Sequence, residues 1–180
     1  ELNVTLSIGI AIYPHDGKTP RELMFNADAA MYHTKHMGRN GYHFFQPSMN
    51  TLAQKQLQLM NDLWMALERH ELQLVYQPKF QAPVGPVVGF EALLRWQHPI
   101  DGLLSPDLFL PLAEKSGLII PIGNWVIDEA CRQLREWHLQ GHEEWSVAVN
   151  LSTLQFEQPQ LVETVLNSLA RHHIPPHTLI

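Results

Sequence analysis

The sequence is poor in cysteine, in long apolar runs and in basic residues. Its one cysteine, Cys131, cannot form an internal disulfide and is typical of a protein in a reducing cytosol. No window approaches the roughly 20 continuous apolar residues of a membrane span, so we expect a cytoplasmic protein whose membrane anchor, if it has one, precedes Glu1. The net charge of −6 argues against binding to nucleic-acid polymers, which need a basic surface. An anionic ligand would therefore need local Arg or Lys residues or a bound metal.

The first 45 residues have the pattern of a small α/β unit. Residues 3–12 predict a strand, and the Pro and Asp-Gly within residues 13–17 predict a turn. Thr19 can cap the next helix, with Pro20 at its first position and Glu22 completing a capping box. The apolar stripe of this helix ends near Gly38, and residues 42–45 predict a short strand.

Lys35 and Arg39 lie near the predicted end of that helix, one turn apart and therefore neighbours on its surface. Two cations at this position can complement the negative end of the helix dipole. The alternative is a two-cation clamp on a phosphate group. The pattern alone leaves both interpretations open.

A change of composition divides the chain. Residues 46–53 begin with Gln-Pro-Ser-Met-Asn, which is typical of a linker, and a helix is expected over about residues 52–69. We therefore predict a first domain at residues 1–45, a linker at 46–53 and a second domain at 54–180.

Residues 87–96 predict the central strand of the second domain, since β-branched and aromatic residues dominate them. Side chains alternate along a strand, which places Glu91, Leu93 and Arg95 on one face. The opposite face is wholly apolar, as expected where helices pack behind a sheet. Glu91 and Arg95 are about 13 Å apart at ~3.3 Å per residue, too far for a direct ion pair. They belong either to a shared site or to a solvated face with two charges.

Strands and helices alternate through the second domain. Strands are predicted at residues 72–80, 87–96 and 145–151 with a new one starting at 178, and helices at residues 105–117, 121–141 and 160–172. This alternation indicates a parallel α/β array, either an open doubly wound sheet or a closed barrel. In both, the carboxyl ends of strands carry the site, and Glu91, Arg95 and Asn150 lie there. Asn150 is either a turn cap or, with Glu91, a ligand of a hard cation such as Mg2+ or Mn2+.

Motifs of the first 45 residues follow a family pattern. They are Val4 to Ala11 with the turn Tyr13-Pro14-His15-Asp16-Gly17, and Ala27-Asp28-Ala29-Ala30-Met31-Tyr32-His33-Thr34-Lys35 with Gly38-Arg39-Asn40. They resemble the C-terminal part of a GGDEF domain, a family that makes cyclic di-GMP from GTP. The resemblance implies that Lys35 and Arg39 contact the phosphates of GTP. Thr34 stands where the family usually has Ala, and the family's GGDEF hairpin and metal-binding aspartate are not in this chain.

Further motifs run in order over about residues 57–180. They are Tyr76-Gln77-Pro78-Lys79, Gly89-Phe90-Glu91-Ala92-Leu93-Leu94-Arg95-Trp96, His98-Pro99, Ser105 to Glu114, Ser116-Gly117-Leu118 and Val149-Asn150-Leu151-Ser152. This domain resembles the N-terminal half of an EAL domain. The resemblance implies a partial TIM-like (β/α)8 barrel, preceded by the end of an α/β GGDEF domain, and hydrolysis of cyclic di-GMP to linear pGpG.

The same resemblance implies a role for each polar residue of the predicted site. Glu91 and Asn150 would bind the catalytic Mg2+ or Mn2+. Arg95 would hold a substrate phosphate, Gln77 would touch a guanine, and Leu93 would help to wall the pocket. The family's downstream Glu, its paired aspartates and its lysine base would lie beyond Ile180, so we expect no complete catalytic centre within these residues.

We therefore expect part of a tandem GGDEF–EAL protein that acts in bacterial second-messenger signalling as a cyclic di-GMP phosphodiesterase, and as a homodimer when complete. One alternative is an EAL half that binds cyclic di-GMP without cutting it, and another is a cyclase with a regulatory EAL half. The truncated chain alone is expected to be inactive. It is also expected to be poorly soluble or to self-associate, because an incomplete barrel leaves strand edges unpaired and apolar faces uncovered.

Overall fold

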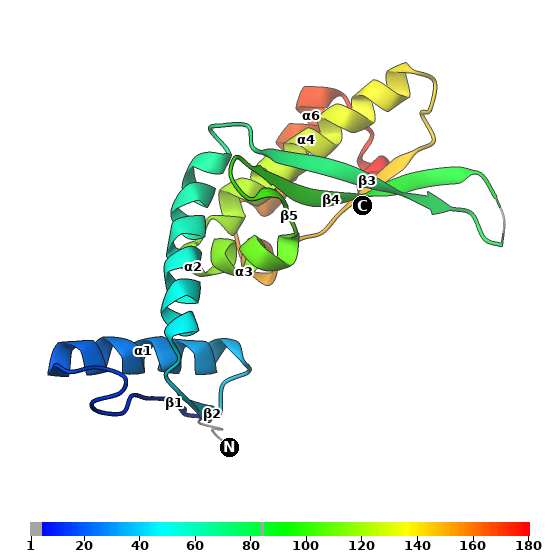
Figure 1. Cartoon of the computed structure of the whole chain (residues 1–180). Coiled ribbons are helices and arrows are strands. Elements are labelled where there is room, and N and C mark those ends of the chain that lie inside the picture. The colour runs from blue at the N-terminus through cyan, green and yellow to red at the C-terminus, as the bar shows by residue number, and fades with distance from the viewer. Residues whose placement is uncertain (1–4, 84) are drawn as a thin grey trace. The chain divides into compact units, whose positions relative to one another are not determined.

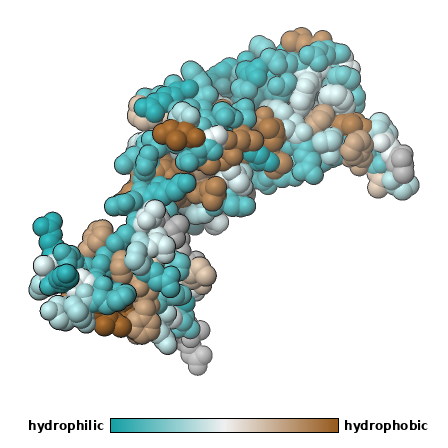
Figure 2. All heavy atoms as spheres, in the orientation of Figure 1, coloured by the Kyte–Doolittle hydropathy of each residue, from teal (hydrophilic) through white to brown (hydrophobic). Residues whose placement is uncertain are grey.

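The computed structural model describes residues 5–83 and 85–180, except for the side chains of His36, Leu52 and Ala53. The chain divides into two compact units, Glu1–Leu59 and Met60–Ile180 (Figure 1). Among the described residues, no helix has the length and apolar character needed to cross a bilayer. On the face shown in Figure 2, hydrophobic residues form separate patches among hydrophilic ones.

In the first unit, two short strands pair in parallel and pack against one helix. Strand β1 (Ser7–Ile10) pairs with β2 (Gly41–Phe44), and α1 (Pro20–His36) connects them. The predicted strand at residues 3–12 is therefore too long, and residues 3 and 4 lie outside the described part. The capping box is confirmed: the Glu22 N–H donates to the Thr19 hydroxyl, and the Thr19 N–H donates to the Glu22 carboxylate, both over 3.2 Å.

Helix α2 (Pro47–Ala66) begins five residues earlier than the predicted Leu52. The stretch with linker-like composition is helical from Pro47 onward, since proline suits the first turn of a helix and the Met49 side chain is buried. The division between the two compact units falls inside this helix, after Leu59. The functional domain boundaries at residues 45 and 54 stay a prediction.

The second unit is built on a long hairpin. Strands β3 (Leu72–Phe80) and β4 (Val87–His98) pair antiparallel, β5 (Gly102–Leu104) pairs antiparallel with the end of β4, and β6 (Ser146–Val149) pairs parallel with its middle. The prediction of a parallel array is therefore wrong for β3 and β5, which both run antiparallel to β4. In the described residues, the connections after β3 and β4 contain no helix, and such short loops join antiparallel neighbours. The helical connection between β4 and β6 gives the expected parallel pair.

Helices cover this sheet. They are α3 (Pro106–Ser116), α4 (Ile119–Leu139), α5 (Thr153–Phe156) and α6 (Leu161–His172), followed by the 3-10 turn η1 (Pro176–Thr178). Figure 1 shows α4 and α6 lying together along the hairpin, and the two helices are in contact. The core joins Ala92 of β4 and Val147 of β6 to Ala130 and Leu134 of α4. Helix α4 therefore packs behind the two strands that carry the predicted site.

Candidate active site

Glu91 and Asn150 meet at one edge of the sheet. The parallel register pairs Glu91 with Ala148 and Ala92 with Val149, so Asn150 follows directly at the carboxyl end of β6. The Asn150 side chain Nδ2 donates to Glu91 Oε1 over 2.8 Å. Strand pairing thus brings together two side chains that are 59 positions apart in the sequence.

Gln77 and Arg95 extend the same face of the sheet. Gln77 is the direct partner of Glu91 in the antiparallel β3–β4 ladder, so their side chains lie on one side. Arg95 lies four residues beyond Glu91 and pairs with Gln73. One Arg95 guanidinium nitrogen donates to the Leu94 carbonyl oxygen over 2.8 Å, which ties the side chain to its own strand.

A cavity of about 330 Å3 lies on the helical side of β4. Apolar residues of β4, α3 and α4 form most of its wall, together with Leu93, Asn150, Ser152 and Gln155. Glu91, Gln77 and Arg95 are not among its lining residues. Of the polar residues predicted for the candidate site, Asn150 therefore borders this cavity, whereas Glu91, Gln77 and Arg95 do not.

The donor set suits a hard divalent cation but is incomplete. Glu91 offers carboxylate oxygens, and Asn150 offers its amide oxygen because its amide nitrogen already donates to Glu91. In the part of the chain that the structure describes, no three His, Cys, Asp or Glu side chains gather as metal ligands. Two oxygen ligands are present, and a full coordination shell needs further donors.

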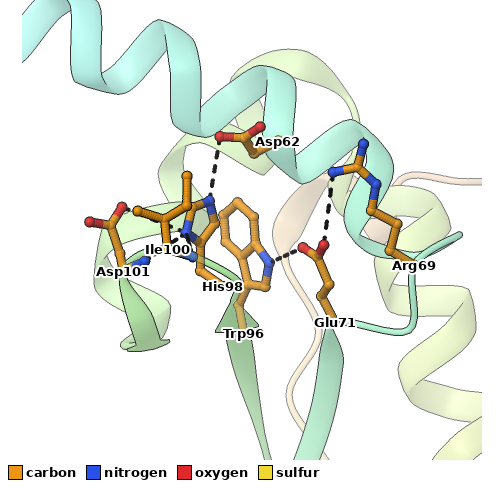
Figure 3. A network of polar contacts seen from close by, with 7 residues as sticks. All are labelled: Asp62, Arg69, Glu71, Trp96, His98, Ile100 and Asp101. Atoms are coloured by element: carbon orange, nitrogen blue, oxygen red, sulfur yellow. Dashed lines mark hydrogen bonds and ion pairs between the residues drawn. The ribbon is translucent and has the colours of Figure 1, made fainter.

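Buried polar contacts anchor the end of β4 (Figure 3). The buried Trp96 indole donates to Glu71 Oε2 over 3.0 Å. The buried His98 Nδ1 accepts from the Asp101 backbone N–H over 3.0 Å, so the imidazole proton resides on Nε2, 3.4 Å from Asp62 Oδ2. These contacts fix the strand that carries Glu91 and Arg95 to α2 and to the turn before β5.

The turn after Asn150 contains two features that are not among the predicted elements. Helix α5 follows Asn150 closely, and Gln155 in this helix is buried. Ser152 and Gln155 form a reciprocal capping box. The Ser-x-x-Gln spacing in the sequence is the signal that could have predicted both helix α5 and the role of Gln155 in capping it.

The cations of the first unit do not share a helix face. We predicted that Lys35 and Arg39 lie one turn apart on the surface of this helix. Helix α1 ends at His36, before Arg39, so this prediction is wrong. Gly38 has a φ of 108° and Arg39 a φ of 61°, and both residues lie beyond the helix. Lys35 and Arg39 are both exposed at this end of α1.

Thr34, the residue that departs from the GGDEF pattern, is fully buried at 1% exposure. Its hydroxyl lies 2.9 Å from the Ala30 carbonyl oxygen, 3.1 Å from that of Ile8 and 3.0 Å from His43 Nδ1. The hydroxyl therefore has partners on α1, β1 and β2. Threonine replaces alanine here without leaving a buried polar group unpaired.

Two family models match this chain. The EAL domain model matches residues 60–180, and the model for the GGDEF domain of diguanylate cyclases matches residues 1–41. The chain belongs to the EAL domain family, and the end of a GGDEF domain precedes its EAL part.

Relatives of established name support this membership. The bifunctional diguanylate cyclase/cyclic di-GMP phosphodiesterase MucR of Pseudomonas aeruginosa is 61% identical over the whole chain, which covers 26% of MucR. The cyclic di-GMP phosphodiesterase NbdA of the same species is 42% identical over 93% of the chain, which covers 22% of NbdA. The chain thus spans about a quarter of the length of these curated relatives.

A solved structure is also similar. The PaMucR phosphodiesterase in complex with c-di-GMP is 59% identical with a TM-score of 0.67, and the match covers 68% of this chain and 49% of that one. This likeness confirms the predicted fold class, part of a TIM-like EAL barrel with the end of a GGDEF domain before it.

Proposed function

We propose that the complete protein hydrolyses cyclic di-GMP to linear pGpG in the cytoplasm, with Mg2+ or Mn2+ as cofactor. The contact between Glu91 and Asn150 on paired parallel strands carries this proposal, because it sets two hard oxygen ligands side by side. The phosphodiesterases MucR and NbdA, and the c-di-GMP complex of PaMucR, support the choice of substrate.

Glu91 and Asn150 would hold the metal ion. Such an ion polarises a phosphoryl oxygen and lowers the pKa of bound water. Arg95 would bind a substrate phosphate and neutralise its charge through the two parallel N–H donors of its guanidinium. The Asn150 hydrogen bond keeps the Glu91 carboxylate turned toward β6, so both ligands face one point.

Gln77 and Leu93 would recognise the base. Gln77 lies opposite Glu91 in the hairpin, and its amide can both donate to and accept from a guanine edge. Leu93 lies between Glu91 and Arg95 and presents an apolar side chain to the bound nucleotide. The alternation of polar and apolar side chains along β4 thus suits a ligand with a phosphate and a purine ring.

Two further parts of the proposal concern the complete protein. Lys35 and Arg39 would bind the phosphates of GTP, which the GGDEF match and the exposure of both residues support. The complete protein would be a homodimer. Phe156 and Val162 in the second unit are 74% and 68% exposed, and such apolar side chains favour association.

The test uses the full-length protein with Mg2+ or Mn2+ and measures linear pGpG by chromatography. Glu91→Ala should lower turnover at least about 100-fold, more than the 10- to 100-fold typical of outer-shell partners. The matched control is Glu163→Ala, which removes an exposed carboxylate on α6. Undiminished turnover in Glu91→Ala would contradict the proposal.

Two results with the wild-type protein would favour the alternatives. Binding of cyclic di-GMP without any linear product would indicate a receptor. Net synthesis of cyclic di-GMP from GTP would indicate a cyclase with a regulatory EAL half.

A further inference from the structure

We propose that Gln155 is a positioning residue that holds Asn150 in place for metal binding. The inference rests on the proposed function, because it assigns Asn150 to the metal. It concerns a residue to which the proposed function gives no direct contact with the metal or the substrate.

Gln155 fixes the turn that carries Asn150. Its side-chain Oε1 accepts from the Ser152 backbone N–H over 3.0 Å, and its own backbone N–H donates to the Ser152 hydroxyl over 3.3 Å. Ser152 lies only two residues after Asn150. The capping box therefore sets the direction in which the chain leaves β6, and with it the place of the Asn150 side chain.

Gln155 is in turn held by helix α4. The Gln155 side chain is 4% exposed and lies against Gly123. A Cβ at Gly123 would be 1.7 Å from Gln155 Nε2, so only glycine leaves room for the amide. The contact links the turn after Asn150 to the helix that packs behind β4 and β6.

The Gln155 amide nitrogen does not stabilise the fold. Nε2 is buried and has no hydrogen-bond partner, which costs stability relative to an apolar side chain of the same size. What the glutamine provides is the acceptor for the Ser152 N–H. Because metal ligands must be held within about 0.5 Å of the productive geometry, a fixed turn beside Asn150 serves the metal site.

The test measures Mn2+ affinity of the full-length protein by electron paramagnetic resonance, and cyclic di-GMP affinity in EDTA by calorimetry. Gln155→Met keeps the volume and removes the acceptor. It should weaken Mn2+ binding about 10- to 100-fold, as loss of an outer-shell partner does, and leave nucleotide affinity in EDTA within about twofold. Gly123→Ala should act in the same direction because its Cβ displaces the amide.

Two variants complete the comparison. Gln155→Glu keeps an acceptor for the Ser152 N–H, and glutamate is common at this position of a capping box, so it should recover most of the Mn2+ affinity. Gln158→Met makes the same chemical change at an exposed position just after α5 and should bind Mn2+ as the wild type does.

Unchanged Mn2+ affinity in Gln155→Met would overturn the inference. So would an equal loss of Mn2+ and cyclic di-GMP affinity, since general structural damage gives that result. A wild-type protein that binds Mn2+ without producing pGpG would refute the proposed function alone, and the Mn2+ comparison would still decide the role of Gln155.

Discussion

The two compact units place their candidate site residues by different means. In residues 60–180, Glu91, Gln77 and Asn150 are set by strand register, and a 2.8 Å hydrogen bond joins the two proposed metal ligands. In the first unit, Lys35 and Arg39 are exposed at the end of α1, and Arg39 lies beyond it. Strand pairing therefore brings together the residues of one candidate site, whereas Lys35 and Arg39 lie where a helix ends and a turn begins.

Among the substitutions that follow, the largest effect is expected at Arg95, the proposed phosphate ligand of the candidate site. In the full-length protein, Arg95→Lys keeps the charge but loses the planar fork, which should weaken cyclic di-GMP binding roughly 10- to 100-fold, or about 1.5–3 kcal/mol. Calorimetry measures the change. Arg135→Lys on α4 is the control, and equal affinity of the two variants would contradict a phosphate contact at Arg95.

Gly89→Ala tests the close pairing of β4 with β6. A Cβ at Gly89 would lie 2.4 Å from the Ser146 carbonyl oxygen of the paired strand, so β4 and β6 must move apart. We expect a loss of about 1–3 kcal/mol in the free energy of unfolding, measured with urea. Val88→Ala, at a half-exposed neighbour, should cost less. Equal losses would mean that close β4–β6 pairing is not required.

Thr34→Val probes the framework of the first unit. The substitution keeps the shape and removes the buried hydroxyl that bridges α1, β1 and β2, with an expected cost of about 1 kcal/mol. Hydrogen exchange of the β2 amides in the whole chain measures it, with Thr34→Ser as the control that retains the hydroxyl. Faster exchange in the serine variant than in the valine variant would contradict this role.

The smallest effect concerns Cys131, in the core behind the candidate site. Burial raises the pKa of the thiol to about 11 from 9.0, so the neutral form dominates at pH 8 and alkylation by iodoacetamide should be slow until the protein unfolds. Because the pKa is raised in the folded state, this contribution to stability is present below pH 9 and is lost as the pH rises toward 11. Equal alkylation of folded and unfolded protein at pH 8 would show that α4 does not shield the core.

Local patterns predict much of this fold. The Thr19–Glu22 capping box and the bounds of β3 are as expected, and alternation along β4 puts Glu91 and Arg95 on one face. The strand-end rule also anticipates that Glu91 and Asn150 lie close together. These features depend on chemistry within a few residues or on a simple rule of strand order.

Other features depend on contacts that no local pattern contains. The composition of residues 46–53 indicates a linker, but burial of Met49 supports a helix there. Strands β3 and β4 pair antiparallel because their connection is too short to hold a helix. The prediction of a parallel array considered only that strands and helices alternate, and did not consider the length of this connection. The place of Gln155 depends on Gly123, a residue on a different helix.

The central claim is that β4 and β6 place Glu91 and Asn150 as two ligands of one metal ion. The direct measurement is an anomalous difference map from crystals of the full-length protein soaked with Mn2+. We predict one peak within about 2.1–2.3 Å of a Glu91 carboxylate oxygen and of the Asn150 amide oxygen, the range of small divalent cations. A bound Mn2+ that contacts neither of these side chains would contradict the account.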